Sequence, residues 1–424
     1  MSWLLVPFLA FMAILGTPLF AILALLTLIA FAAAGVDSTS VAIEMYRMAE
    51  APMLIAIQLF TFAGYLLSEG GAPARLVRLS RALLGWMPGG LALVSLGACA
   101  IFTAFTGASG VTIIALGGLL LPALQAEKYP DRFTYGLLTT SGSLGLLFPP
   151  SLPIILVAYV SAASVDQLFV AGVLPGMLLL LVLGAYAFQS ARRYRVPRQR
   201  FAWRELGGAA RAAAWEIPLP IVVLGGIYTG KVTVTEAASL TAMYALLAEA
   251  VIYRDVKLRD LPRVFTESMV LVGGILMILG TALGLTNYLI DAEVPNAIFE
   301  WIQKWIDNRF VFLILLNVFL LIVGCLMDIF SAILVVMPLI LPVAQAYGVD
   351  PVHLGIIFLT NLEIGYSTPP VGLNLFISSF RFGKPVVELY RASLPFLALY
   401  LLALLLITYF PALSLWLVGV LGVR

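Results

Sequence analysis

The hydrophobic positions of this chain form long apolar runs, separated by short segments that hold most of the polar and charged residues. Several runs reach the roughly 20 residues that a helix needs to cross the hydrocarbon core of a bilayer. The pattern therefore predicts an all-α polytopic membrane protein. The nine expected crossings cover residues 3–34, 51–69, 134–162, 167–190, 214–230, 234–252, 264–290, 353–382 and 389–421.

Two distant segments of the chain, 119–150 and 339–370, carry the same pattern without a gap. Nine of their 32 aligned positions are identical, and each segment ends in two adjacent prolines. Proline lacks an N–H and interrupts a helix, and a bilayer tolerates broken backbone only where protein or a wet cavity surrounds it. Duplicated broken segments are typical of the binding site of a secondary transporter. The predicted helix breaks are Pro149, Pro150, Pro369 and Pro370.

The distribution of charge predicts how the first half of the chain is oriented. The segment 73–86 is basic, and basic segments of membrane proteins lie preferentially on the cytoplasmic side. The loop 127–133 is expected on the same side, so residues 87–126 should enter and leave the membrane there as a re-entrant helical hairpin. The tip of this hairpin lies near residues 106–110. The alternative is two plain spans, but the small polar residues of the tip would make a poor external loop.

The second half of the chain shows the opposite charge balance. The segment 293–306, which corresponds to 73–86 in the repeat, is mainly flanked by acidic residues, which implies the opposite face of the membrane. The two halves are therefore predicted to be inverted repeats, with residues 310–346 forming a second re-entrant hairpin that enters from outside. This topology places the N-terminus in the cytoplasm and the C-terminus in the periplasm.

The overall composition agrees with a membrane protein and excludes several other functions. The chain is 62% hydrophobic and 11% charged, with a mean hydropathy of +1.06, so it is not a soluble domain. Its basic residues lie in short loops, which speaks against nucleic-acid binding. The segment 225–231 resembles a phosphate-binding loop but has Val232 where that loop needs Ser or Thr, so no nucleotide is expected. No constellation of residues indicates an enzyme, and His353 has no partner that would indicate a metal site.

Small polar residues gather at the first hairpin tip and at the first break. Thr106, Gly107 and Ser109 lie at the tip and face Ser143 and Gly145 in the broken helix. Carbonyl and hydroxyl oxygens suit an alkali cation, whereas the N–H groups of interrupted helices attract a carboxylate. Small residues also let helices pack closely, but packing alone does not explain their position beside a double proline in both halves.

The second half contributes a corresponding group of candidates. Asp328 is an acid at the predicted hairpin tip, where a charge costs at least about 2.5–3.5 kcal/mol and so needs a partner or a function. It could coordinate a cation or hold the tip. Glu363 is a second candidate, for which a structural hydrogen bond is the alternative. The candidate substrate-binding residues of both halves are Thr106, Ser109, Asp328, Ser331, Asn361 and Asn374.

Four segments of the chain resemble a known family. The runs GASG (107–110), GSLGLLFPPS (142–151), GGIYTGKVTVTEAA (225–238) and GYSTPPVGLNLF (365–376) are similar to the large membrane subunit of tripartite ATP-independent periplasmic (TRAP) transporters. The resemblance implies an elevator-type ion-transporter fold, coupling to two or more Na⁺ ions and uptake of an organic acid such as a dicarboxylate or a sialic acid. The sodium ligands that it implies are Gly107, Ser109, Ser143 and Gly145, and Asp328, Gly365 and Thr368.

The resemblance also implies partners and a division into domains. The partners are a separate small four-helix membrane subunit and a periplasmic substrate-binding protein, in the inner membrane of a bacterium. The expected transport domain comprises residues 87–162 and 310–382. The expected scaffold comprises residues 1–86 and 163–309, with one arm helix each, and 383–424. The alternatives are a stand-alone Na⁺- or H⁺-coupled carboxylate symporter and a membrane-embedded enzyme or scaffold protein.

Overall fold

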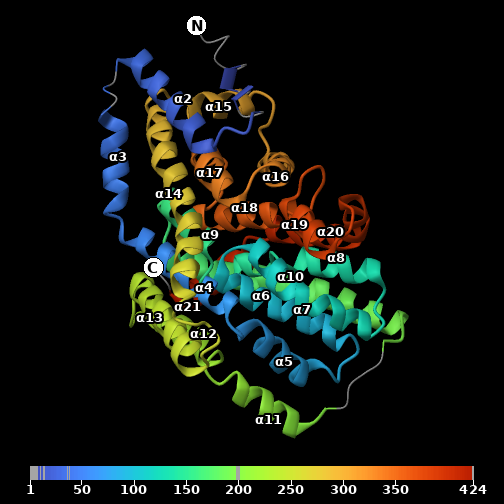
Figure 1. Ribbon diagram of the computed structural model, residues 1–424. Helices are drawn as coiled ribbons and strands as arrows, with labels where there is room; N and C mark the ends of the chain where they lie inside the picture. The colour runs from blue at the N-terminus through green and yellow to red at the C-terminus, as the bar shows by residue number, and fades with distance from the viewer. Residues whose placement is uncertain are drawn as a thin grey trace.

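The computed structural model describes residues 8–9, 11–12, 15–35, 37, 39–196 and 201–422. Every regular element within these residues is a helix, which confirms the predicted all-α fold. In Figure 1 the long helix α14 (Leu261–Asp291) runs along one side of the molecule. Helices α10 (Val165–Arg193) and α18 (Pro351–Gly365) pack against each other in the middle of the molecule.

The remaining helices follow in chain order. The first part of the chain forms α2 (Leu19–Ala34), α3 (Thr39–Ala49), α4 (Pro52–Glu69), α5 (Ala72–Leu84), α6 (Gly90–Thr106), α7 (Ser109–Ala126), α8 (Asp131–Ser141), the 3₁₀-helix η1 (Leu144–Leu147) and α9 (Leu152–Ser161). The middle part forms α11 (Trp203–Ala212), α12 (Pro218–Tyr228), α13 (Val234–Leu246) and the π-helix η2 (Leu247–Ile252). The last part forms α15 (Val294–Gln303), α16 (Arg309–Leu326), α17 (Ile329–Ala346), α19 (Leu373–Phe382), α20 (Val386–Tyr409) and α21 (Ala412–Leu421).

The repeat found in the sequence is visible in the helix bounds. The alignment of 119–150 with 339–370 corresponds to a shift of 220 residues. With this shift, α7 and α17 begin and end at equivalent residues. Likewise, α6 and α16 end at equivalent residues, and α8 and α18 begin at equivalent residues. The two repeats also pack against each other, because α9 contacts α17 and α19 contacts α7. The second part of each broken helix therefore lies on the helix pair of the other repeat. The inverted orientation of the repeats in the membrane stays a prediction.

Three predicted crossings differ from the helices that form. The first does not run continuously over 3–34: Gly16 lies in a turn and α2 starts only after Pro18, while residues 3–7 lie outside the described part. The last, 389–421, is divided between α20 and α21 at Pro411, because proline cannot continue the hydrogen bonding of α20. The expected span 214–230 contains only the 11 residues of α12.

Eight helices of the described residues are long and apolar enough to cross a membrane. The bent pair Asp131–Leu147 and Leu152–Ser161, with an angle of 46° between its parts, makes a possible ninth. Three of the eight are α7, α16 and α17, which the sequence predicts to be arms of the hairpins. Whether these arms are re-entrant or cross the bilayer fully therefore stays a prediction.

A cluster of charged residues attaches α5, the predicted first arm helix, to residues 216–255. The Arg75 guanidinium forms an ion pair with Glu249 at 2.7 Å and also pairs with Glu216 and Asp255. Its Cζ atom lies 3.7 Å from the centroid of the Tyr253 ring. Glu249 and Glu216 are buried, so one cation compensates carboxylates that have little access to water.

Replacement of Arg75 by alanine is therefore expected to destabilise the protein by about 3–5 kcal/mol, because it leaves buried carboxylates without their cation. Thermal unfolding of the purified protein in detergent measures this effect. Arg81→Ala is the matched control, since Arg81 on the same helix pairs with Glu127 at 3.0 Å but has a side chain that is 40% exposed. A pair with one partner exposed should contribute less than the buried Arg75 cluster, about 0–1 kcal/mol, so equal losses in both variants would contradict a special role of Arg75.

Candidate functional site

The turn between α6 and α7 forms the first tip. Helix α6 ends where Gly107 adopts a left-handed backbone conformation, with φ of +65°, and a Cβ there would collide with the side chain of Leu152. Glycine fits this position because it has no Cβ. The Thr103 hydroxyl lies 2.7 Å from that of Thr112 and donates to the carbonyl oxygen of Gly142 at 2.8 Å. The tip is thus bound to the interrupted backbone of the first break.

Both breaks approach their helix pair through a glycine. A Cβ at Gly145 would overlap the carbonyl oxygen of Ala100 and the amide nitrogen of Ala104 in α6. A Cβ at Gly365 would lie 2.5 Å from the carbonyl carbon of Gly324 and 2.9 Å from the nitrogen of Cys325 in α16. Gly145 and Gly365 are equivalent in the repeat, and so are the parts of α6 and α16 that they touch. Backbone lies directly on backbone at both places.

The turn between α16 and α17 forms the second tip, and Asp328 caps α17. Its Oδ1 atom accepts hydrogen bonds from the N–H groups of Phe330 and Ser331, both at 3.0 Å, and its Oδ2 accepts one from the Ser331 hydroxyl. A carboxylate at a helix N-terminus is stabilised by these free N–H groups and by the helix dipole. The Asp328 side chain is also exposed at the surface of the protein. The structure thereby joins two of the predicted site residues.

The second break is tied to this tip by hydrogen bonds. The N–H of Ile329 donates to the hydroxyl of Tyr366, and the N–H of Gly372 donates to the carbonyl oxygen of Cys325 at 3.0 Å. The Thr368 hydroxyl donates to the carbonyl oxygen of Ile364 at 2.8 Å, inside its own helix turn. The hydroxyl proton of Thr368 is therefore already used.

The two breaks differ in their exposure. Pro149 and Pro150 are buried, whereas Pro369 and Pro370 are exposed. The hydroxyl of Tyr390, from α20, donates to the carbonyl oxygen of Pro370. The second break is thus open to the surroundings in this conformation and the first is closed.

A hydrogen bond between Ser109 and Asn374 joins the two repeats. The Ser109 hydroxyl donates to Oδ1 of Asn374 at 2.7 Å. Ser109 is the first residue of α7 and Asn374 is the second of α19, and no side chain caps either helix. Two helix N-termini with their partial positive charge therefore converge here. The Nδ2 group of Asn374 and the hydroxyl of Ser378, one turn further along α19, are buried without a hydrogen-bond partner.

Comparison with known proteins gives a family for this arrangement. Residues 5–413 match the family described as "Tripartite ATP-independent periplasmic transporter, DctM component". The chain belongs to the DctM family. A C4-dicarboxylate TRAP transporter large permease protein of Pseudomonas aeruginosa is 38% identical over 384 residues, which cover 90% of each chain. A relative of the same description from Rhodobacter capsulatus is 38% identical over 398 residues.

Other DctM relatives and a solved structure extend the comparison. An isethionate TRAP transporter permease protein DctMQ of Oleidesulfovibrio alaskensis is 35% identical over 86% of this chain and 58% of its own length. The YdaH transporter of Alcanivorax borkumensis has a similar fold, with a TM-score of 0.58, 13% identity and coverage of 89% of both chains. The resemblance stated from the sequence is thus confirmed. As a DctM protein, the chain is a transporter subunit rather than an enzyme.

Two predicted substrate residues of this DctM protein have their contacts elsewhere. The Nδ2 group of Asn361 donates to Oδ1 of Asn317 at 2.7 Å and to the carbonyl oxygen of Ile357 at 2.8 Å, so Asn361 links α18 to α16. The Thr106 hydroxyl makes a 3.5 Å hydrogen bond to the carbonyl oxygen of Ala108 within the first tip. Neither of these hydrogen bonds reaches the Ser109–Asn374 junction. Ser378 is not among the residues predicted from the sequence, but its spacing of four from Asn374 places both on one helix face.

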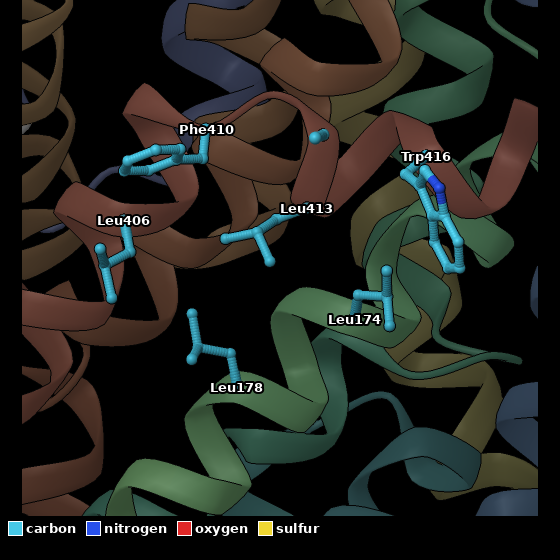
Figure 2. Close-up of a pocket in the computed structure, with 7 residues that line it drawn as sticks. Leu174, Leu178, Leu406, Phe410, Leu413 and Trp416 are labelled. Carbon is cyan, nitrogen blue, oxygen red and sulfur yellow. The ribbon is translucent and has the colours of Figure 1, made fainter.

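The cavity in Figure 2 does not coincide with this site. It measures about 500 Å³ and lies between α10 and the break that separates α20 from α21, where Leu178, Leu413 and Trp416 point toward it. Its lining is apolar and offers no group that would bind an organic acid or a cation. The described residues also contain no cluster of three or more His, Cys, Asp or Glu side chains. Backbone and hydroxyl oxygens dominate both tips, and these are ligands for hard cations.

Proposed function

We propose that this chain is the large membrane subunit of a TRAP importer in which the inward movement of Na⁺ drives the uptake of an organic acid. The observation that carries the proposal is the junction of Ser109 and Asn374. There, two helix N-termini without a side-chain cap meet inside apolar protein. The backbone N–H of Asn374 donates to the carbonyl oxygen of Tyr366 at 3.0 Å, so the unpaired side-chain amide of Asn374 is the donor that this residue offers to an anion. A carboxylate group fits such a site because its negative charge and its acceptor oxygens complement the partial positive charge and the donors of the site.

The names of the relatives indicate the chemical class of the substrate. Those relatives are described as permeases for C4-dicarboxylates, isethionate and ectoine, all of which carry a carboxylate or a sulfonate. The substrate proposed here is a dicarboxylate, a sialic acid or a related carboxylate. Its acidic group would lie at Ser109 and Asn374, with Ser378 as a further donor.

The proposed coupling ions would bind where each tip meets its break. In the first half, Gly107, Ser109, Ser143 and Gly145 offer backbone and hydroxyl oxygens, and in the second half Asp328, Gly365 and Thr368 do so. Each Na⁺ that moves inward supplies about 2.3 kcal/mol per 100 mV, and about 1.4 kcal/mol more for a tenfold gradient. Two ions would supply roughly 7 kcal/mol, enough to concentrate an anion without ATP.

The proposed mechanism is an elevator in which residues 87–162 and 310–382 move against the remaining helices. The reciprocal packing of α9 on α17 and of α19 on α7 supports this division, because it makes the two repeats one unit. The proposed partners are a small four-helix membrane subunit and a periplasmic substrate-binding protein. The proposed location is a bacterial inner membrane, with the N-terminus in the cytoplasm and the C-terminus in the periplasm.

Reconstitution into liposomes with both partner proteins tests the proposal. Uptake of the organic acid is expected to fall at least tenfold when K⁺ replaces Na⁺ outside, because the driving ion is then missing. Equal uptake in both salts would contradict sodium coupling. Liposomes that hold this chain alone are the control for the partners: transport without them would identify a stand-alone symporter instead.

A further inference from the structure

We infer that Glu363, from the second repeat, supplies the negative charge for the sodium ion bound at the first tip and break. The inference rests on the proposed sodium coupling and adds a residue to that site. Glu363 lies on α18, in the last turn before the second break. It is the only acidic residue of this helix, and it is completely buried.

The position of Glu363 in the repeat places it beside the first site. Its equivalent in the first repeat is Ser143, which is one of the proposed sodium ligands. The Ser143 hydroxyl donates a hydrogen bond to the backbone carbonyl oxygen of Glu363 at 3.5 Å. Two equivalent residues that touch each other must lie next to the axis that relates their repeats. Glu363 therefore stands where the two halves meet, against the break of the first half.

The surroundings of Glu363 leave its carboxylate without compensation. Both carboxylate oxygens are buried and have no hydrogen-bond partner, and none of the ion pairs of the described residues includes Glu363. The hydroxyl of Tyr400 donates to the carbonyl oxygen of Thr140, three residues before Ser143, at 2.9 Å. An unpaired carboxylate in such a place costs several kcal/mol, so it either takes up a proton or binds a cation. In the inference made here, Na⁺ is this cation.

A comparison of the charges at the two proposed sodium sites also points to Glu363. The second site has an acid of its own, Asp328. The first site consists of Gly107, Ser109, Ser143 and Gly145, which are all neutral. A sodium ion surrounded only by neutral groups would keep its full charge inside apolar protein. The Glu363 carboxylate would balance it, and the hydroxyl of Ser141, also buried without a partner, lies two residues from Ser143.

Thermal unfolding of the complete protein in detergent, measured against Na⁺ concentration with K⁺ keeping the ionic strength constant, tests this inference without a transport assay. We expect the wild type to be stabilised by Na⁺. In Glu363→Gln the Na⁺ concentration for half-maximal stabilisation should rise at least tenfold, because a neutral amide replaces the countercharge. In K⁺ alone this variant should be at least as stable as the wild type, since it no longer buries an unpaired charge.

The possible outcomes separate the inference from the proposed function. If Na⁺ does not stabilise the wild type more than K⁺ does, the sodium coupling itself is contradicted. If Na⁺ stabilises the wild type and Glu363→Gln responds within twofold, only the role of Glu363 is overturned. A variant that is less stable than the wild type in K⁺, or does not fold, would show a structural hydrogen bond and also overturn it. Glu363→Asp, which keeps the charge but shortens the side chain, should give an intermediate shift.

Discussion

Uptake driven by Na⁺ is expected to fall to the background of protein-free liposomes when Asp328 is replaced by alanine. The substitution removes the cap of α17, whose first N–H groups bind Oδ1 at 3.0 Å, and the acid proposed for the second sodium site. Loss of the cap alone costs about 0.5–2 kcal/mol of stability. Loss of the charge removes the group that would balance a bound ion. The initial rate of uptake in proteoliposomes with both partner proteins measures the effect.

Two further variants separate the cap from the charge. Asp328→Asn keeps an oxygen that can cap α17, so this protein should retain its stability and still lose sodium-driven uptake. Asp350 caps α18 in the same way, through the N–H groups of Val352 at 2.8 Å and His353 at 3.2 Å. It lies after the C-terminal end of α17, whereas the second tip lies before the N-terminal end of that helix. Asp350→Ala should therefore lower stability by a similar amount and leave uptake largely intact. Full uptake by Asp328→Ala would contradict the proposed second site.

The sequence is sufficient to predict the features that depend on local chemistry. Adjacent prolines cannot continue a helix, and both breaks form where the Pro-Pro pairs stand, between α8 and α9 and between α18 and α19. The tips form at Gly107 and Asp328, residues typical of a left-handed turn and of a helix cap. These predictions succeed because each needs only the conformational preference of one or two residues.

Predictions that depend on packing are less complete. Asn361 and Asn374 are both amides in apolar helices, and nothing local to either shows that one binds Asn317 and the other Ser109. Pro395 lies inside α20 whereas Pro411 divides α20 from α21, so a proline in the predicted crossing 389–421 does not by itself show where the helix ends. Likewise, the buried first break and the exposed second break carry the same Pro-Pro pattern. Their difference reflects the arrangement of whole helices, which a single sequence does not specify locally.

The convergence at Ser109 and Asn374 follows from the exchange of contacts between the repeats. Each break is followed by the N-terminus of a half-helix. Because α19 packs on α7, the N-terminus of α19 meets that of α7. A donor-rich site thereby forms between the two halves. The duplication of one unit thus accounts for a proposed binding site to which both units contribute.

Gly145→Ala is expected to lower uptake by more than tenfold and stability by about 1–3 kcal/mol, the usual range for overpacking. The added Cβ would overlap the carbonyl oxygen of Ala100 and the amide nitrogen of Ala104, which are backbone atoms that cannot move aside as a side chain does. To admit it, the first break must move away from α6. The oxygens proposed to bind the first sodium ion would then separate. Thermal unfolding and uptake in proteoliposomes measure the two effects.

A glycine elsewhere in the same protein provides the control. Gly273 lies inside α14, and a Cβ there would have no other atom within 4 Å. Gly273→Ala should leave uptake unchanged and stabilise the helix by up to about 1 kcal/mol, since alanine has the higher helix propensity. Gly365→Ala should behave like Gly145→Ala, because the equivalent Cβ would lie 2.5 Å from the carbonyl carbon of Gly324. Normal uptake by both break variants would show that close backbone contact at the breaks is not needed for transport.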